Sequence, residues 1–295
     1  MGKRELKIII TGGGSGIGAA LAKELSANGH TVVICGRRLP NLKKLSSASN
    51  NIYHFICDVS NEENVISFSN FVKDKFEFID VIINCAGLFG AIGRFDKTDS
   101  NMWKKTFNIN LFSVYLITKH FLPLLLRSNI KKIINFSGGG AFGGFPNYSA
   151  YAVSKAAVVR FSENIAIELA DHGVHVNCVA PGFVATEIHN TTLNLGEETA
   201  GDQFKLTKAK LKEGSVPMEV VVNCVKFLVS SESNGLTGKT ISARFDEWNT
   251  EIFKKSIDQI TNSELYTMRR INLINLNEND ELRNTLMKIE DSNYF

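Results

Sequence analysis

Tyr151 and Lys155 are the pair of side chains in this sequence best suited to move a proton. They lie four positions apart in a stretch of helical character near residues 149–171, and residues at this spacing share one face of a helix. A free tyrosine is a poor acid or base near neutral pH, but a nearby ammonium favours the phenolate and lowers its pKa. Because the spacing is also common in ordinary amphipathic helices, the pair indicates proton transfer only if other elements place it beside a reactant.

A glycine-rich turn near the N-terminus supplies that context. Residues 8–10 (III) predict a buried strand, and residues 11–18 (TGGGSGIG) follow it and lead into a helix rich in Ala and Leu. Gly12 permits a tight turn, Gly16 lets backbone N–H groups approach a pyrophosphate, and Gly18 allows the helix to pack closely on the strand. A flexible turn would also explain the glycines, but their position after the first strand favours a dinucleotide-binding loop at a helix N-terminus.

The end of the second predicted strand bears on which dinucleotide is bound. An NAD enzyme usually offers an acidic residue there to the ribose 2′-hydroxyl, but residues 33–38 (VICGRR) contain no carboxylate. Arg37 can instead pair with a 2′-phosphate through charged donors. We therefore expect NADP, with NAD as the alternative; the competing interpretation is that Arg37 or Arg38 covers the adenine or lies in solvent.

The elements that must position these groups alternate between short β-branched runs and longer helical stretches. This alternation predicts an α/β fold, a Rossmann-type doubly wound parallel sheet of seven strands with helices on both faces. The region from about 187 to 214 is polar and irregular, and we expect either a mobile lid or a surface insertion there. Strands are expected near 7–10, 31–35, 52–57, 81–84, 132–136, 174–179 and 239–242, and helices near 17–28, 40–48, 62–75, 100–127, 149–171 and 217–231.

Composition narrows the setting of the protein. The 295 residues are 44% hydrophobic, which supports a substantial core, and the net charge of +3 is spread along the chain, so nucleic acid is not expected as a partner. No apolar run is long enough for a signal peptide or a membrane helix, and the five cysteines are embedded in apolar sequence, as expected of reduced thiols. A cytoplasmic location is therefore expected, with no metal, because the histidines lack metal-ligand spacing.

Several motifs occur together in a fixed order, and in that order they resemble the short-chain dehydrogenase/reductase family over residues 6 to about 242. The resemblance implies an NAD(P)-dependent oxidoreductase that interconverts a carbonyl and a secondary alcohol by hydride transfer, with Tyr151 as general acid and base. The motifs are residues 11–18, Cys57-Asp58-Val59, Asn84-Cys85-Ala86-Gly87, Asn110, Tyr151-x-x-x-Lys155 and Pro181-Gly182-x-x-x-Thr186.

The resemblance also implies roles for individual residues. Lys155 would hold the nicotinamide ribose, and Asn110 would support a water path to that lysine, with Asn108 as its local competitor. Cofactor contacts are implied for Gly12, Ser15, Gly16, Ile17 and Gly18 in the glycine loop, Arg37 beside the ribose, Asp58 and Val59 at the adenine, Asn84, Ala86 and Gly87 at the central strand, Tyr151 and Lys155, and Pro181, Gly182, Val184 and Thr186 at the nicotinamide and its carboxamide.

The sequence departs from the family at the serine that orients the substrate carbonyl. That serine lies thirteen positions before the tyrosine, where this chain has Gly138; Ser137, the candidate for a further catalytic residue, is one position too early. Three explanations stay open: the glycine N–H groups replace the hydroxyl, Ser137 reaches the cleft through a local rearrangement, or the protein binds cofactor without ordinary turnover. Losing one oxyanion donor typically costs about 2.7 to 4 kcal/mol, which slows an enzyme without abolishing it.

Two functions follow from these residues. The first is an oxidoreductase acting on a small-molecule carbonyl or alcohol, a sugar derivative being one option; the alternative is a catalytically impaired dinucleotide-binding scaffold or redox sensor. The helices near 100–127 and 149–171 resemble those through which the family self-associates, so a homodimer or homotetramer is expected.

The hydrophobic pattern changes after Ser242. Ile252, Phe253, Ile257 and Ile260 recur at helical spacing, and Asn-rich sequence separates them from a further short helical pattern. We therefore expect a dinucleotide-binding and catalytic domain over 1–244 and a C-terminal helical appendage over 245–295.

Overall fold

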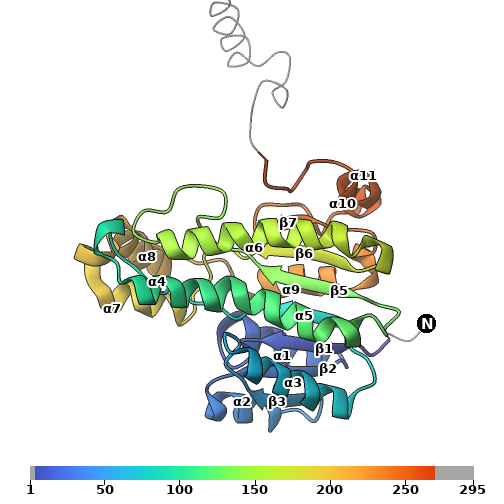
Figure 1. Ribbon diagram of the computed structural model, residues 1–295. Coiled ribbons are helices and arrows are strands. Elements are labelled where there is room, and N and C mark those ends of the chain that lie inside the picture. The colour runs from blue at the N-terminus through green and yellow to red at the C-terminus, as the bar shows by residue number, and fades with distance from the viewer. Residues whose placement is uncertain (1–3, 270–295) are drawn as a thin grey trace, which may run out of the picture.

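The computed structural model describes residues 4–269, which contain a sheet of seven parallel strands in the order β3-β2-β1-β4-β5-β6-β7 (Figure 1). The strand order reverses at β1, which pairs with β2 on one side and β4 on the other. The predicted doubly wound α/β fold is therefore confirmed. The strands are β1 (Lys7–Thr11), β2 (Thr31–Gly36), β3 (Ile52–Ile56), β4 (Val81–Asn84), β5 (Lys132–Phe136), β6 (His175–Ala180) and β7 (Lys239–Ser242).

Helices cover both faces of this sheet. Successive residues of a strand point to opposite faces, so Ile8 and Ile10 of β1 pack with one set of helices and Ile9 with the other. The first set is α1 (Gly16–Ala27), α2 (Leu39–Ser46) and α9 (Met218–Val229), and the second is α3 (Glu62–Lys75), α5 (Ser113–Leu125) and α6 (Ser149–Glu168). None of the described helices is both long and apolar enough to span a membrane.

The long helix expected near 100–127 is interrupted in the structure. It consists of α4 (Ser100–Phe107), a π-helical turn over Asn108–Phe112, and α5. Asn110 lies inside this turn and is fully buried. Its side chain accepts a hydrogen bond from the backbone N–H of Leu88 and donates one to the Leu88 carbonyl, each at 2.9 Å. The turn therefore fits the helix to the loop that follows β4, a tertiary contact that helical periodicity does not encode.

The region that appeared irregular, about 187 to 214, forms two helices, α7 (Ile188–Ala200) and α8 (Asp202–Glu213). Gly196 and Gly201 have positive φ values of 75° and 61° and break the helical path. The residues that α7 buries are mostly small or polar, His189, Thr192 and Ala200. Because these types carry no hydrophobic periodicity, the sequence pattern concealed the helices.

Residues 245–269 pack against the β7 edge of the sheet, where α10 (Glu251–Lys255) and α11 (Ile257–Thr261) lie (Figure 1). Trp248 is buried against Phe227 of α9. Thr240 of β7 donates its backbone N–H to the Tyr266 carbonyl at 2.8 Å, so this segment covers the backbone of an edge strand that would otherwise be open to pairing.

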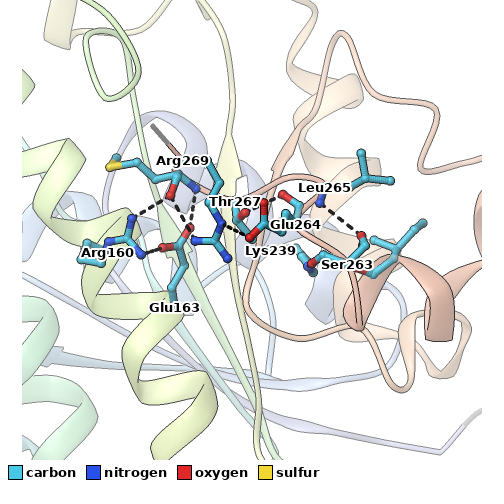
Figure 2. Close-up of polar contacts among 10 residues, drawn as sticks. Arg160, Glu163, Lys239, Ser263, Glu264, Leu265, Thr267 and Arg269 are labelled. Atoms are coloured by element: carbon cyan, nitrogen blue, oxygen red, sulfur yellow. Dashed lines mark hydrogen bonds and ion pairs between the residues drawn. The ribbon is translucent and has the colours of Figure 1, made fainter. Parts of the chain in front are cut away.

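The same segment is attached to α6 by charged groups (Figure 2). Glu163 accepts a hydrogen bond from the Met268 N–H at 2.6 Å, and Arg160 donates to the Met268 carbonyl at 2.7 Å. Lys239 of β7 donates to the Ser263 carbonyl at 2.6 Å. The expected domain boundary near 244 stays a prediction, and the part of the expected appendage from 270 to 295 lies outside the described residues.

Candidate active site

The motif residues gather at the carboxyl edge of the sheet, beside the point where the strand order reverses. Open α/β sheets bind ligands at such a switch point. The Thr11 hydroxyl accepts hydrogen bonds from the backbone N–H groups of Cys85 and Ala86, each at 3.1 Å. The loops that follow β1 and β4 are thereby fixed to each other at the base of the site.

The glycine loop has the geometry that a dinucleotide requires. Gly12 and Gly16 have positive φ values of 67° and 53°, and a Cβ atom on Gly18 would lie 2.5 Å from the Gly12 carbonyl oxygen. Side chains are therefore excluded from the places where the backbone must approach a pyrophosphate and where α1 must approach β1. The first N–H groups of α1, which begins at Gly16 after Ser15, lack partners within the helix and can bind a phosphate. The residues present fit a dinucleotide.

The end of β2 carries the two arginines. The guanidinium of Arg38 donates to the Ser15 hydroxyl at 2.7 Å and to the Glu187 carboxylate at 2.9 Å, so it links the glycine loop to the segment that precedes α7. Burial alone would raise the pKa of Asp58, but hydrogen bonds from Ser60 and the nearby charge of Arg37 outweigh burial and lower it. Arg37 is thus close to Asp58 and exposed to solvent, and the structure brings together these two predicted cofactor residues.

The loop after β6 runs toward the glycine loop. Gly182 has a positive φ of 73°, and a Cβ atom on Gly16 would lie 3.4 Å from the Thr186 methyl group. Pro181 lies next to the end of β6, and Val184 is buried. The predicted nicotinamide segment and the predicted phosphate segment are therefore adjacent.

Tyr151 and Lys155 lie on the face of α6 that is turned into the protein, and they are only 7% and 5% exposed. The Lys155 ammonium donates to the Phe136 carbonyl at the end of β5 at 2.8 Å, and it lies 5.9 Å from the centre of the Tyr151 ring. Burial lowers the pKa of Lys155 from its ordinary value of 10.5 to about 8. Burial raises the pKa of Tyr151, so the lowering expected from the adjacent ammonium is not found in this arrangement.

Of the predicted partners Asn84, Gly87 and Asn110, the last two lie beside the lysine. A Cβ atom on Gly87 would lie 3.5 Å from the Lys155 ammonium and 3.4 Å from the side-chain oxygen Oδ1 of Asn110. Asn110 also donates to the Ser154 hydroxyl at 3.0 Å, which fixes it to α6. Asn84 lies deeper, where it donates to the Asn135 side chain at 2.9 Å. Glycine at position 87 thus leaves the space around the ammonium open.

Gly138, rather than Ser137, lies against the Tyr151 hydroxyl. An ideal Cβ atom on Gly138 would fall well inside the van der Waals distance of the Tyr151 oxygen. The Ser137 hydroxyl is buried and has no hydrogen-bond partner among the described residues, and its backbone N–H is bonded to the Val179 carbonyl. The structure therefore does not bring Ser137 to Tyr151, and the tyrosine hydroxyl lies in the space that a side chain at 138 would need.

Aromatic residues that sequence reasoning missed surround Tyr151. The Phe89 ring packs edge to face against the Tyr151 ring, with 4.9 Å between the ring centres. The centre of the Phe145 ring lies 6.3 Å from that of Tyr151. The Tyr148 hydroxyl is hydrogen-bonded at 2.8 Å to Thr192 of α7, which holds this helix against the start of α6. Phe89 lies two positions after the Asn84–Gly87 motif, and that position was the one signal that could have identified it.

The contact between Gly138 and Tyr151 gives a stability prediction. Gly138→Ala should lower the free energy of unfolding by about 1 to 3 kcal/mol, because the new methyl group must displace the tyrosine. Gly139→Ala is the matched control, since its Cβ atom would meet Phe145 at an ordinary 3.7 Å, and it should change stability by less than about 1 kcal/mol. Urea unfolding measures both. Equal effects of the two substitutions would contradict the contact.

The buried lysine gives a prediction about pH. Between about pH 8 and the ordinary lysine value of 10.5, the unfolded chain retains a proton at Lys155 that the folded chain has released. The free-energy cost of burying the charged Lys155 side chain therefore has its largest value below pH 8 and declines as the pH rises. Lys155→Met should be most stabilising, relative to wild type, at pH 7, and this difference should fall by up to about 1.4 kcal/mol per pH unit above pH 8.

Urea unfolding at intervals from pH 7 to 10 measures this difference. Comparing the variant with the wild type cancels the titration of groups that do not interact with Lys155. Cys85 and Cys178 do interact with it, but burial raises their pKa values to about 12 and about 11, above this pH range. Lys23→Met, at an exposed position on α1, is the control and should give a difference independent of pH. A pH-independent difference for Lys155→Met would show that the ammonium is not desolvated.

Comparisons with known proteins agree with this geometry. The sequence profile described as short chain dehydrogenase matches residues 6–194. The chain is 30% identical over 234 residues to a 3-oxoacyl-[acyl-carrier-protein] reductase of Haemophilus influenzae, covering 79% of this chain and 94% of that protein. It is 31% identical over 245 residues to (+)-borneol dehydrogenase 2 of Salvia officinalis, covering 79% and 86%.

A solved structure is also similar to this one. The ligand-free aldohexose dehydrogenase of Thermoplasma acidophilum superposes with a TM-score of 0.71 at 25% identity, covering 81% of this chain and 92% of that one. The strand order, the glycine loop and the positions of Tyr151 and Lys155 on one helix agree with the sequence match. The chain therefore belongs to the short-chain dehydrogenase family of NAD(P)-dependent oxidoreductases.

Proposed function

We propose that this protein is an NADP(H)-dependent reductase or dehydrogenase that interconverts a carbonyl compound and a secondary alcohol. The observation that carries the proposal is the burial of the Tyr151 hydroxyl and the Lys155 ammonium at the same sheet edge as the glycine loop. A phenol, an ammonium and a dinucleotide loop in one place suit proton transfer coupled to hydride transfer.

In the reductive direction Tyr151 gives its proton to the carbonyl oxygen of the substrate. The bound cofactor supplies the hydride. Because burial raises the pKa of Tyr151, the phenol stays protonated at neutral pH and is ready to donate. Lys155, whose pKa is about 8, is largely protonated at neutral pH and stabilises the phenolate that remains. Asn110 holds the loop after β4 against α6, which keeps the lysine in place.

The glycines that follow β5 are proposed to replace the missing serine. Among the described residues the backbone N–H groups of Gly138, Gly139 and Gly140 have no hydrogen-bond partner, whereas Ala141 donates to the Gly138 carbonyl at 3.2 Å. Free backbone donors next to the tyrosine hydroxyl can stabilise an oxyanion without a side chain.

The side chains packed near Tyr151 bear on the choice of substrate. Tyr151 belongs to a hydrophobic cluster that includes Phe89, Ile92, Phe145 and Phe204, and these side chains offer few partners for the several hydroxyls of a sugar derivative. We therefore favour an apolar carbonyl compound over the sugar option. A homodimer or homotetramer and a cytoplasmic location stay predictions.

Gly138 also favours a second candidate function, a scaffold or redox sensor that binds the dinucleotide without turnover. Its specific motivation is that the Tyr151 hydroxyl occupies the space that a side chain at position 138 would need. This candidate predicts tight cofactor binding but no reduction of any carbonyl in a broad panel.

The proton-donor role is tested by Tyr151→Phe. The substitution should lower kcat by about 10²- to 10⁴-fold and leave NADPH binding nearly unchanged, because only the hydroxyl is removed. NADPH oxidation followed by absorbance, with a panel of ketones and aldehydes, measures the rate. Tyr53→Phe on β3, remote from the motif residues, is the control. A full rate in Tyr151→Phe would refute the assignment, and tight binding without wild-type turnover would favour the sensor.

The cofactor preference is tested by Arg37→Ala. Loss of a charged donor to the 2′-phosphate should weaken NADPH binding about 10- to 100-fold and leave NADH binding nearly unchanged. Arg38→Ala probes the neighbouring guanidinium, and Arg127→Ala, at an exposed position beyond α5, is the control. Fluorescence titration gives the dissociation constants. Equal weakening for NADPH and NADH would show that Arg37 does not read the 2′-phosphate.

A further inference from the structure

His189, in the first turn of α7, has a buried ring nitrogen that the proposed mechanism does not use. The residue is 8% exposed, and its Nε2 lies 3.0 Å from the Val184 carbonyl oxygen. A carbonyl oxygen only accepts, so Nε2 must carry the proton. The Nδ1 atom has no hydrogen-bond partner among the described residues.

The ring is neutral at physiological pH. Burial lowers the pKa of His189, the Val184 carbonyl raises it in part, and the charge of Lys210 lowers it further. With the proton on Nε2, the neutral ring presents a bare lone pair at Nδ1. A buried acceptor without a partner costs about 1 to 3 kcal/mol, so its presence calls for a ligand group or a water molecule that pairs with it.

The surroundings of His189 connect it to the tyrosine. Its ring stacks on Phe183 with 3.9 Å between ring centres and meets the edge of Phe89 at 5.5 Å. Phe89 in turn meets the Tyr151 ring at 4.9 Å. His189 and Tyr151 therefore contact the same aromatic side chain, that of Phe89.

Other polar atoms of this wall already have partners. The hydroxyls of Tyr148 and Thr192 are hydrogen-bonded to each other at 2.8 Å. The Ser137 hydroxyl is unpaired, but it belongs to the residue that follows β5 and is buried next to the sheet. The hydrophobic side chains packed here are Phe89, Ile92, Phe145 and Phe204, so Nδ1 of His189 is a buried acceptor that these aromatic surroundings leave unpaired.

We propose that Nδ1 of His189 accepts a hydrogen bond from a hydroxyl or N–H group of the substrate, and that the substrate is an apolar, ring-containing carbonyl compound with such a donor. This inference rests on the proposed function, because it places the carbonyl at Tyr151. A site built around a buried acceptor rejects analogues that lack the donor, since the acceptor is then left unpaired.

The test uses the ortho, meta and para isomers of hydroxyacetophenone and the matched methoxyacetophenones. Each pair has nearly the same shape, but only the hydroxyl can donate. In the wild type with NADPH, kcat/KM for at least one hydroxy isomer should exceed that of its methoxy partner by about tenfold. Because the bond exists before and during the reaction, the preference should appear mainly in KM.

Variants at position 189 separate recognition from folding. His189→Leu should abolish the hydroxyl preference, so that kcat/KM becomes similar within each hydroxy and methoxy pair. His189→Gln can donate to the Val184 carbonyl through its amide and still offer an oxygen acceptor, so it should keep part of the preference even if the leucine variant folds poorly. His172→Leu, at an exposed position after α6, is the matched control.

Equal kcat/KM within every pair in the wild type, or an unchanged preference in His189→Leu, would overturn the proposal; a nitrogen that binds only a buried water gives the first result. If no acetophenone is reduced, the proposed function is in question, and calorimetric binding of the same probes to the NADP-loaded protein decides the inference separately. A hydroxyl preference in binding that disappears in His189→Leu would support it, and its absence would reject it.

Discussion

The arrangement of the site depends on one buried contact, the hydrogen bond from the Lys155 ammonium to the Phe136 carbonyl at the end of β5. An ammonium this deeply buried loses its hydration, so it must be held by protein acceptors. The bond fixes the inner face of α6 at the carboxyl edge of β5 and, with it, Tyr151. The Asn110 side chain, bonded to both Leu88 and Ser154, fixes the same helix to the loop after β4. These buried hydrogen bonds thus place Tyr151 and Lys155 at the same edge of the sheet.

Glycines, which carry no side chain, determine much of the remaining geometry of the site. A Cβ atom on Gly18 would lie 2.5 Å from the Gly12 carbonyl oxygen, too close for any side chain there. Gly138 extends this pattern, because a side chain there would overlap the Tyr151 hydroxyl. In this chain the Tyr151 hydroxyl lies in the space that a side chain at position 138 would need, so glycine at that position leaves room for the tyrosine.

Residues at the start of α7, together with Glu187 just before it, contact two parts of the site. Glu187 pairs with Arg38 at the adenosine end, while His189, two residues later, stacks on Phe183 and contacts Phe89 beside Tyr151. Thr192 adds a hydrogen bond to Tyr148 at the start of α6. Because Arg38 and Glu187 are exposed, their pairing is weak and salt-sensitive, whereas the buried contacts of His189 and Thr192 are not screened. The contacts of His189 and Thr192 therefore hold α7 more firmly than the pair of Arg38 and Glu187 does.

The sequence by itself determined the sheet, the glycine loop and the pairing of Tyr151 with Lys155, because these features depend on local periodicity, on turn chemistry and on a spacing of one helical turn. It did not reveal the π-helical turn at Asn110 or the helices α7 and α8, since the turn arises from a bond to a distant loop and the helices bury small and polar residues. Only the tertiary structure decided that burial raises rather than lowers the Tyr151 pKa, that Gly138 and not Ser137 meets the hydroxyl, and that His189 lies beside the same phenylalanine as the tyrosine. Each of these depends on segments far apart in the chain, whose contacts and desolvation no local pattern encodes.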